Sequence, residues 1–277
     1  LAGEGGASSW LAEYLEEPDS LLDSGRDLID ARGPLARCVW RGCLPGLLAL
    51  SDDVVSDFFS SYVQTYLERD VRTVADVRSL SDFGRFLALS GALTGQEIND
   101  SKLGRQLGMS QTTARRWRDT LTHGYQWRQL APFHGNTIKR LSGRAKGVMC
   151  DTGLACYLQR IGSPAALLAS PYLGSLFETF VINQIHSQFA TLPLAPAAYH
   201  WRTAGGAEVD LVLDFDGCLY PMEVKCKTVL SGHDTRGLRA FRDTYPKDRV
   251  RPGLVIYAGE EPYRLDRPTL AVPWTLG

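Results

Sequence analysis

The sequence contains no apolar run that approaches the length of a membrane-spanning helix, which is about 20 residues. It also lacks G-x-x-x-x-G-K-[ST], the glycine-rich loop that cradles nucleotide phosphates, so this chain should hold no ATP site of that kind. None of the six cysteines forms a C-x-x-C pair, which favours reduced thiols over a disulfide framework. These absences predict a cytoplasmic protein without a membrane segment.

A starting methionine and a signal peptide are also missing, which we interpret as the mark of a fragment of a longer protein. The 277 residues, of which 44% are hydrophobic and 22% charged, suffice for two folded domains and a connector. The net charge is only −1, but residues 99–146 carry ten basic and two acidic side chains. Such a segment usually indicates contact with nucleic-acid phosphate, and the alternative is a solvated basic face.

Residues 99–123 have the pattern of two short helices joined by a tight turn. The first helix should end at Gly108, and Ser110 should cap a second helix that runs through Leu121. This arrangement predicts a helix-turn-helix. The second helix would present five polar side chains to nucleic acid, namely Gln111, Thr112, Arg115, Arg116 and Arg118.

Two strands of a wing should follow that helix, at residues 125–133 and 137–141. We therefore expect a winged helix-turn-helix over residues 80–145. DNA is its expected partner, and protein docking is the alternative use of such a module.

Residues 207–227 predict two strands joined by a two-residue turn at Asp216-Gly217. Asp and Gly tolerate the positive φ that both positions of such a turn require. With this turn, Phe215 pairs with Cys218, and the strand register is fixed.

The register places Asp210 directly opposite Glu223, with Lys225 on the same face of the hairpin. Two facing carboxylates repel each other. A divalent cation such as Mg²⁺ would offset the repulsion, because hard cations take carboxylate oxygens as ligands. Lys225 could then stabilise a developing negative charge or position a water.

Helices and strands alternate around this hairpin, which predicts an α/β unit with a mixed sheet. The segments are a strand from Lys146, a helix at 152–160, a helix opened by Ser170-Pro171, a strand at 197–202, the hairpin, a helix at 235–245 and a strand at 252–257. Glu178 lies on the Ser170-Pro171 helix at the edge of an apolar stripe, where a carboxylate needs a partner or a metal. The alternative is that Glu178 reaches solvent or pairs with an arginine.

Asp210 and the Glu223-Val-Lys225 motif, preceded by Glu178 on a helix, resemble the PD-(D/E)XK nuclease core. The resemblance implies that Glu178, Asp210 and Glu223 bind Mg²⁺ or Mn²⁺ and that Lys225 assists the attacking water, so all four would be catalytic. The chain departs from the family because Glu208-Val209, and no proline, precedes Asp210.

Longer motifs, in order along the chain, resemble the C-terminal part of prokaryotic AAA-type ATPases, the "domain of unknown function" after the ATPase module. They are Tyr62-x-x-Thr65-Tyr-Leu-Glu-Arg-Asp70, Lys146-x-x-x-x-Asp151-x-Gly153-Leu154, Gly174-x-x-x-Glu178, Trp201-Arg202 and Glu208-Val-Asp210. The resemblance implies an N-terminal ATPase domain in the complete protein.

Together the patterns predict an α/β (α+β) chain. A helical connector should occupy residues 1–79, the winged helix-turn-helix 80–145, and a PD-(D/E)XK nuclease-like mixed-sheet domain 146–277. The expected function is that of a nucleic-acid-binding, Mg²⁺-dependent nuclease module. The alternatives are a catalytically silent DNA- or protein-binding module and a regulatory protein whose basic segment docks an acidic partner.

Overall fold

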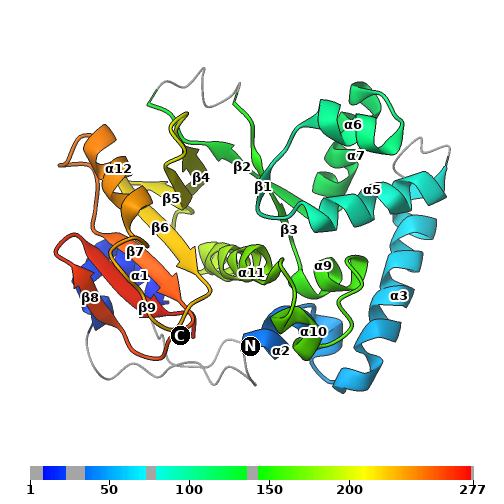
Figure 1. Ribbon diagram of the computed structural model, residues 1–277, viewed down its shortest axis with the longest axis horizontal. Helices are drawn as coiled ribbons and strands as arrows, with labels where there is room; N and C mark the ends of the chain where they lie inside the picture. Colours follow the sequence, from blue (N-terminus) through cyan, green and yellow to red (C-terminus); the bar gives the residue numbers. More distant parts are fainter. Residues whose placement is uncertain (1–8, 23–34, 73–78, 136–142, 276–277) are drawn as a thin grey trace. The chain divides into compact units, whose positions relative to one another are not determined.

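The computed structural model describes residues 9–22, 35–72, 79–135 and 143–275, and these form ten α-helices and nine strands (Figure 1). The mixed α/β class expected from the sequence is confirmed. The chain divides into two compact units. The helical unit comprises residues 33–131 and 142–180, and the sheet unit comprises 1–32, 132–141 and 181–277. None of the described helices is long and apolar enough to cross a membrane, and none of the six cysteines forms a disulfide.

The sheet unit contains six strands in the order β4-β5-β6-β7-β9-β8. They are β4 (Ala197–Arg202), β5 (Glu208–Phe215), β6 (Cys218–Lys225), β7 (Gly253–Tyr257), β8 (Tyr263–Asp266) and β9 (Thr269–Pro273). Strands β4 to β6 pair antiparallel, whereas β6, β7 and β9 pair parallel, so the expected mixed sheet is present. Parallel neighbours need a crossover, and helix α12 (Arg236–Thr244) lies between β6 and β7 in the chain.

Helices cover both faces of this sheet. α12 packs Leu238 and Phe241 into a core with Val212 of β5, and Figure 1 shows it lying across β5 and β6. On the other face, Tyr14 of α1 (Trp10–Glu16) meets the ring of Tyr220 edge-on, with centroids 5.5 Å apart. The faces are opposite because Val212 pairs with the residue next to Tyr220, and successive side chains of a strand alternate.

The helical unit is built from short helices and a three-stranded antiparallel arrangement in the order β1-β3-β2. Its elements are α2 (Leu35–Arg41), α3 (Val55–Thr65), α5 (Leu80–Ala92), β1 (Gln96–Glu97), α6 (Asp100–Leu107), α7 (Gln111–His123), β2 (Trp127–Pro132), β3 (Lys146–Met149), α9 (Thr152–Leu158) and α10 (Pro164–Leu168). Helix α11 (Leu173–Gln188) begins in this unit and ends in the sheet unit. The expected wing strand at 137–141 lies outside the described residues, and β2 pairs with β3.

Residues 52–71 form a continuous helical run that is not uniform. It begins as a 3₁₀ turn at Asp52–Val54, continues as α3 and ends as a π-helix at Tyr66–Val71. The widened last turn falls on the Tyr-Leu-Glu-Arg-Asp motif noted in the sequence. π-turns within helices are rare and are frequent at functional sites.

Asp151 joins two segments of the helical unit. Its Oδ1 accepts a hydrogen bond from the backbone N–H of Leu154 at 2.8 Å, which caps α9. Its Oδ2 accepts the backbone N–H of Cys43 at 2.7 Å, which fixes the loop after α2. Gly42 has φ +72°, and a Cβ there would overlap the Asp151 carboxylate, so glycine is required beside it.

Burial raises the pKa of Asp151, and hydrogen bonds from backbone N–H groups oppose that rise only in part. A carboxyl whose pKa is higher in the folded than in the unfolded state stabilises the fold at low pH. That stability is lost as pH rises from the unfolded pKa through the folded one. We therefore expect the free energy of unfolding of the native chain, relative to Asp151→Asn, to fall as pH rises above about 4.

Urea denaturation of both chains between pH 3.5 and 7 measures this difference. Asp52 provides a control of opposite sign, because hydrogen bonding to Arg37 lowers its pKa. The stability that depends on Asp52 is present above its unfolded pKa and is lost as pH falls through the lower folded pKa. If Asp151→Asn and Asp52→Asn changed the pH profile in the same direction, the assignment for Asp151 would be wrong.

Candidate functional site

The β5–β6 hairpin forms as the sequence indicates. Asp216 and Gly217 have φ of 47° and 74°, and Phe215 pairs with Cys218. The register continues through the pair Leu211–Met222, so the next position along brings Asp210 opposite Glu223. The predicted turn and register are confirmed.

Asp210, Glu223 and Lys225 form one charged cluster, which we call the hairpin cluster. The Lys225 Nζ atom lies 2.5 Å from Glu223 Oε2 and 3.8 Å from Asp210 Oδ2. The backbone N–H of Val224 donates to Asp210 Oδ2 at 2.9 Å. Both carboxylates are buried, whereas the Lys225 side chain is 27% exposed. The lysine therefore connects a buried pair of carboxylates to solvent.

Burial raises the pKa of Glu223 well above its usual range, and the nearby charge of Asp210 raises it further. The ammonium of Lys225 acts in the opposite direction. A buried pair of like charges is costly unless a counter-charge lies close. In the hairpin cluster Lys225 provides that counter-charge.

Helix α12 closes the hairpin cluster on one side at Gly237. A Cβ at this position would overlap the carbonyl oxygen of Glu208 and Oε1 of Glu223. Only glycine permits the helix backbone to approach the strand this closely. The position of the Glu223 carboxylate therefore depends on the absence of a side chain at Gly237.

Glu178 has another partner. It belongs to the helical unit, where its Oε1 lies 2.6 Å from Nζ of Lys146 on β3. The Lys146 side chain is 2% exposed and that of Glu178 15%. The expectation that Glu178 needs a partner holds, and the partner is a lysine rather than an arginine.

Across the described residues there is no group of three or more His, Cys, Asp and Glu side chains placed to hold a metal ion. Glu178 belongs to the helical unit, whereas Asp210 and Glu223 belong to the sheet unit. The two carboxylates of the hairpin cluster still fit a hard cation, because Mg²⁺ commonly binds one or two carboxylates and completes its shell with water. Asp210 and Glu223 are the residues that would hold it.

The second candidate site is the helix pair α6–α7. Asn99 caps α6 by accepting the N–H of Lys102, and Gly108 ends that helix with φ +71°. Ser110 caps α7, whose buried residues include Trp117 and Leu121. The helix boundaries expected from the capping residues are therefore confirmed.

Four of the five residues proposed to contact nucleic acid lie on the exposed side of α7: Gln111, Thr112, Arg115 and Arg116. Arg118 does not, and the expectation that it faces outward is wrong. Its side chain is 17% exposed, and its Nη1 atom donates to Asp100 Oδ1 at 2.9 Å. The physical reason is the burial of Asp100, the first residue of α6, against α7. A buried carboxylate needs a cationic partner, and Arg118 provides it.

Family models match most of the chain. Residues 173–276 match a domain of unknown function, DUF4143. Domains of this family are found C-terminal to AAA ATPase modules, which agrees with the resemblance seen in the sequence. Residues 33–165 match another domain of unknown function, DUF8612. The hairpin cluster lies in the DUF4143 segment, and the helix pair lies in the DUF8612 segment.

Two curated mycobacterial proteins are similar along both segments. They are the uncharacterized proteins Rv2008c of Mycobacterium tuberculosis and Mb2031c of Mycobacterium bovis, each 32% identical over 252 residues. The match covers 90% of this chain and 55% of each relative, so the chain spans about half their length. Among solved structures, protein VC1899 from Vibrio cholerae matches with 14% identity and a TM-score of 0.22, over 79% of this chain and 49% of that one.

The sequence did not single out Lys146 as the partner of Glu178, Asp100 as the partner of Arg118, or Gly237 beside Glu223. The first pair is 32 residues apart, and no local pattern joins a strand residue to a helix residue at that distance. A signal existed for Asp100, since it is one of only two acidic residues in the basic segment. An isolated acid among arginines is a candidate ion-pair partner.

Proposed function

We propose that this chain is a nucleic-acid-binding module with a PD-(D/E)XK-like phosphodiesterase centre at the hairpin cluster, which acts beside an AAA-type ATPase in the complete protein. The observation that carries the proposal is the convergence of Asp210, Glu223 and Lys225 on one face of the hairpin. A Mg²⁺ or Mn²⁺ ion held by the two carboxylates would supply an activated water and stabilise charge on the phosphate. Lys225, which reaches solvent, would orient the attacking water.

The nucleic-acid part of the proposal is supported by the order of elements in the helical unit. Helix α5, strand β1, helices α6 and α7 and strands β2 and β3 follow one another, and β3 pairs with both β1 and β2. This order is typical of a winged helix-turn-helix, and in the proposed module α7 would be the recognition helix. Its exposed Gln111, Thr112, Arg115 and Arg116 would contact the duplex. The compartment we infer is the cytoplasm, where DNA is accessible.

The enzymatic proposal predicts that Asp210→Asn lowers the rate of DNA cleavage by at least about a hundredfold, because it removes one of two candidate cation ligands. Supercoiled plasmid and single-stranded DNA are incubated with Mg²⁺ or Mn²⁺, and the products are separated on gels. Asp216→Asn is the matched control, since it makes the same change on the same hairpin at a turn position where asparagine accepts positive φ. Equal cleavage by the two variants would exclude the hairpin cluster as the catalytic centre.

A catalytically silent binding module is the second candidate function. It is favoured by the balance that Lys225 already provides to the two carboxylates and by the pairing of Glu178 with Lys146. Titration calorimetry with Mn²⁺ separates the two candidates. Heat of binding that is present in the native chain and lost in Asp210→Asn supports the phosphodiesterase. DNA binding without any cation binding supports the silent module.

A further inference from the structure

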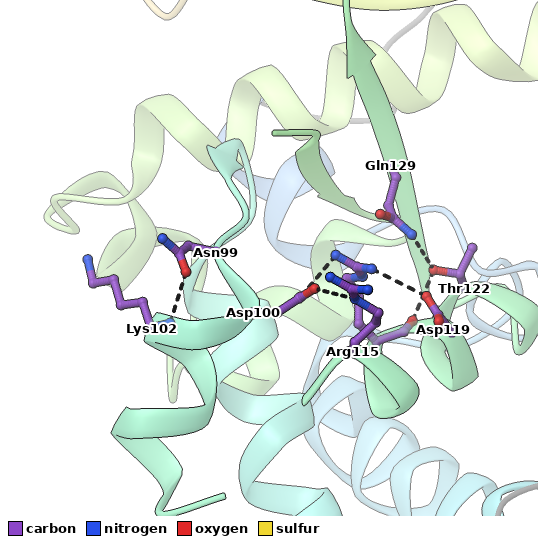
Figure 2. A network of polar contacts seen from close by, with 8 residues as sticks. Asn99, Asp100, Lys102, Arg115, Asp119, Thr122 and Gln129 are labelled. Atoms are coloured by element: carbon purple, nitrogen blue, oxygen red, sulfur yellow. Dashed lines mark hydrogen bonds and ion pairs between the residues drawn. The ribbon is translucent and has the colours of Figure 1, made fainter. Parts of the chain in front are cut away.

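Asp100 is shared between Arg115 and Arg118 of α7, and Figure 2 shows its contact with Arg115. Its Oδ1 accepts a hydrogen bond from Arg118 Nη1 at 2.9 Å, and its Oδ2 accepts one from Arg115 Nε at 3.3 Å. The Asp100 side chain is 8% exposed, so the carboxylate is withdrawn from water and directed at the two guanidinium groups. Both arginines belong to the helix that we propose for DNA recognition.

The two arginines differ in how many of their N–H donors remain available to bind another molecule. Arg118 is largely buried, and its Nη2 also lies 3.4 Å from Asp119, so it is part of the structure. Arg115 is 60% exposed and is held through Nε alone. Its Nη1 and Nη2 atoms contact no hydrogen-bond acceptor within the described part of the chain. These two nitrogens therefore form an outward donor pair whose direction is set by the bond at Nε.

The elements on both sides of this contact are anchored. Asp100 is the first residue of α6 and follows the cap made by Asn99. Helix α7 is tied to β2, because Gln129 donates to the Thr122 hydroxyl at 3.2 Å, and that hydroxyl donates to the Arg118 carbonyl at 3.0 Å. Figure 2 shows the Asn99 cap, the contact of Asp100 with Arg115 and the hydrogen bond between Gln129 and Thr122. The carboxylate and the arginine thus meet in a fixed geometry.

We propose that Asp100 is a positioning residue for DNA binding that acts through Arg115. It holds the guanidinium with its outer nitrogens facing a pair of adjacent acceptors on duplex DNA. Two phosphate oxygens or O6 and N7 of a guanine have that chemistry. The inference rests on the proposed nucleic-acid function. Fixing the side chain in advance removes an ordering cost from binding, which corresponds to about a threefold to tenfold gain in affinity.

A double-mutant cycle tests the proposal. Fluorescence anisotropy measures the affinity of the whole chain for duplexes made only of G·C or only of A·T pairs, over a series of salt concentrations. The chains are native, Asp100→Asn, Arg115→Ala and the double variant. Asp119→Asn is the matched control, since it removes the same charge from the same cluster at a residue that makes no bond to Arg115. Circular dichroism checks the folding of each chain.

In chains that keep Arg115, Asp100→Asn should bind about threefold to tenfold more weakly than Asp119→Asn. In Arg115→Ala chains the two asparagine variants should bind alike. A loss confined to G·C duplexes assigns the acceptor pair to guanine, and an equal loss on both assigns it to phosphate. Additive effects of Asp100→Asn and Arg115→Ala overturn the positioning role and leave the proposed function standing. No binding by the native chain at low salt overturns both.

Arg115→Lys provides a test that does not depend on the folding of Asp100→Asn. Lysine keeps the charge but has neither the Nε–H held by Asp100 nor a planar donor pair. The affinity should fall at least threefold, while the dependence of binding on salt stays that of the native chain. Unchanged affinity in Arg115→Lys overturns the proposal.

Discussion

Gly237→Ala should destabilise the sheet unit by about 1–3 kcal/mol, because the added methyl group overlaps backbone and no side-chain rotation relieves the overlap. The atoms in its path are the carbonyl oxygen of Glu208 and Oε1 of Glu223. Helix α12 would have to move off β5, and the core around Leu238 and Phe241 would lose packing. The same shift would displace the Glu223 carboxylate, so the cation binding that we propose for the hairpin cluster should weaken as well. Chemical denaturation measures the first effect and calorimetry with Mn²⁺ the second.

Whether Gly237→Ala lowers or raises the free energy of unfolding distinguishes a close contact of α12 with β5 from an ordinary exposed helix position. In an exposed helix, glycine to alanine normally gains about 1 kcal/mol of stability. Gly232→Ala is the control, because the nearest atom to a Cβ there is the end of the Arg239 side chain at 3.6 Å, an ordinary contact. That variant should be neutral or slightly stabilising. A gain in stability for Gly237→Ala would mean that α12 does not rest on β5 at this point.

Lys146→Met should cost about 3–5 kcal/mol of unfolding free energy, because it leaves the carboxylate of Glu178 buried without its cation. The Nζ–Oε1 distance of 2.6 Å and the 2% exposure of Lys146 place this pair among the buried ones. Replacing both partners by apolar residues, Lys146→Met with Glu178→Leu, should recover most of the loss. Urea denaturation of the two single variants and the double variant gives the coupling energy.

Arg85 and Asp82 provide the exposed control for this prediction. They form an ion pair at 3.4 Å whose side chains are 62% and 50% exposed. Arg85→Met should change stability by no more than about 1 kcal/mol, since water screens such a pair. If the effects of Lys146→Met and Glu178→Leu on the free energy of unfolding proved additive, the two side chains would not stabilise each other. Glu178 would then be available for the catalytic role implied by the nuclease resemblance.

Elements whose ends are set by local chemistry could be predicted from the sequence. Asp216-Gly217 specified the hairpin and its register, Gly108 and Ser110 set the facing ends of α6 and α7, and the strand expected at 197–202 is β4. In the hairpin and the helix pair, one or two residues with a particular conformational preference decide the structure. The face shared by Asp210, Glu223 and Lys225 followed from the same turn.

Elements that depend on distant partners could not be predicted in this way. β8 and β9 have only four and five residues. The alternation of β8, Tyr263 to Asp266, is too short to predict a strand by itself, and β9 is buried at every position and does not alternate. α11 begins at Leu173, whereas Ser170-Pro171 suggested an earlier start, because the first residues form a turn. The burial of Arg118 depends on Asp100, which precedes it by 18 residues on another helix. The isolated acid marked Asp100 as a candidate ion-pair partner, but no local pattern shows which arginine it holds or that the pair is buried.

Lys225 already occupies the position beside the carboxylates that a cation would take in the hairpin cluster. The ammonium is tethered to the same strand as Glu223, so its effective concentration at the carboxylates is high and does not depend on the surrounding solution. The hairpin can therefore fold with its charges already balanced. A cation bound there, as we propose, would have to displace the lysine, and its apparent affinity would include the free energy of breaking the Lys225–Glu223 ion pair. The released ammonium would then be free to meet an anionic ligand, so that one exchange couples cation entry to the capture of phosphate.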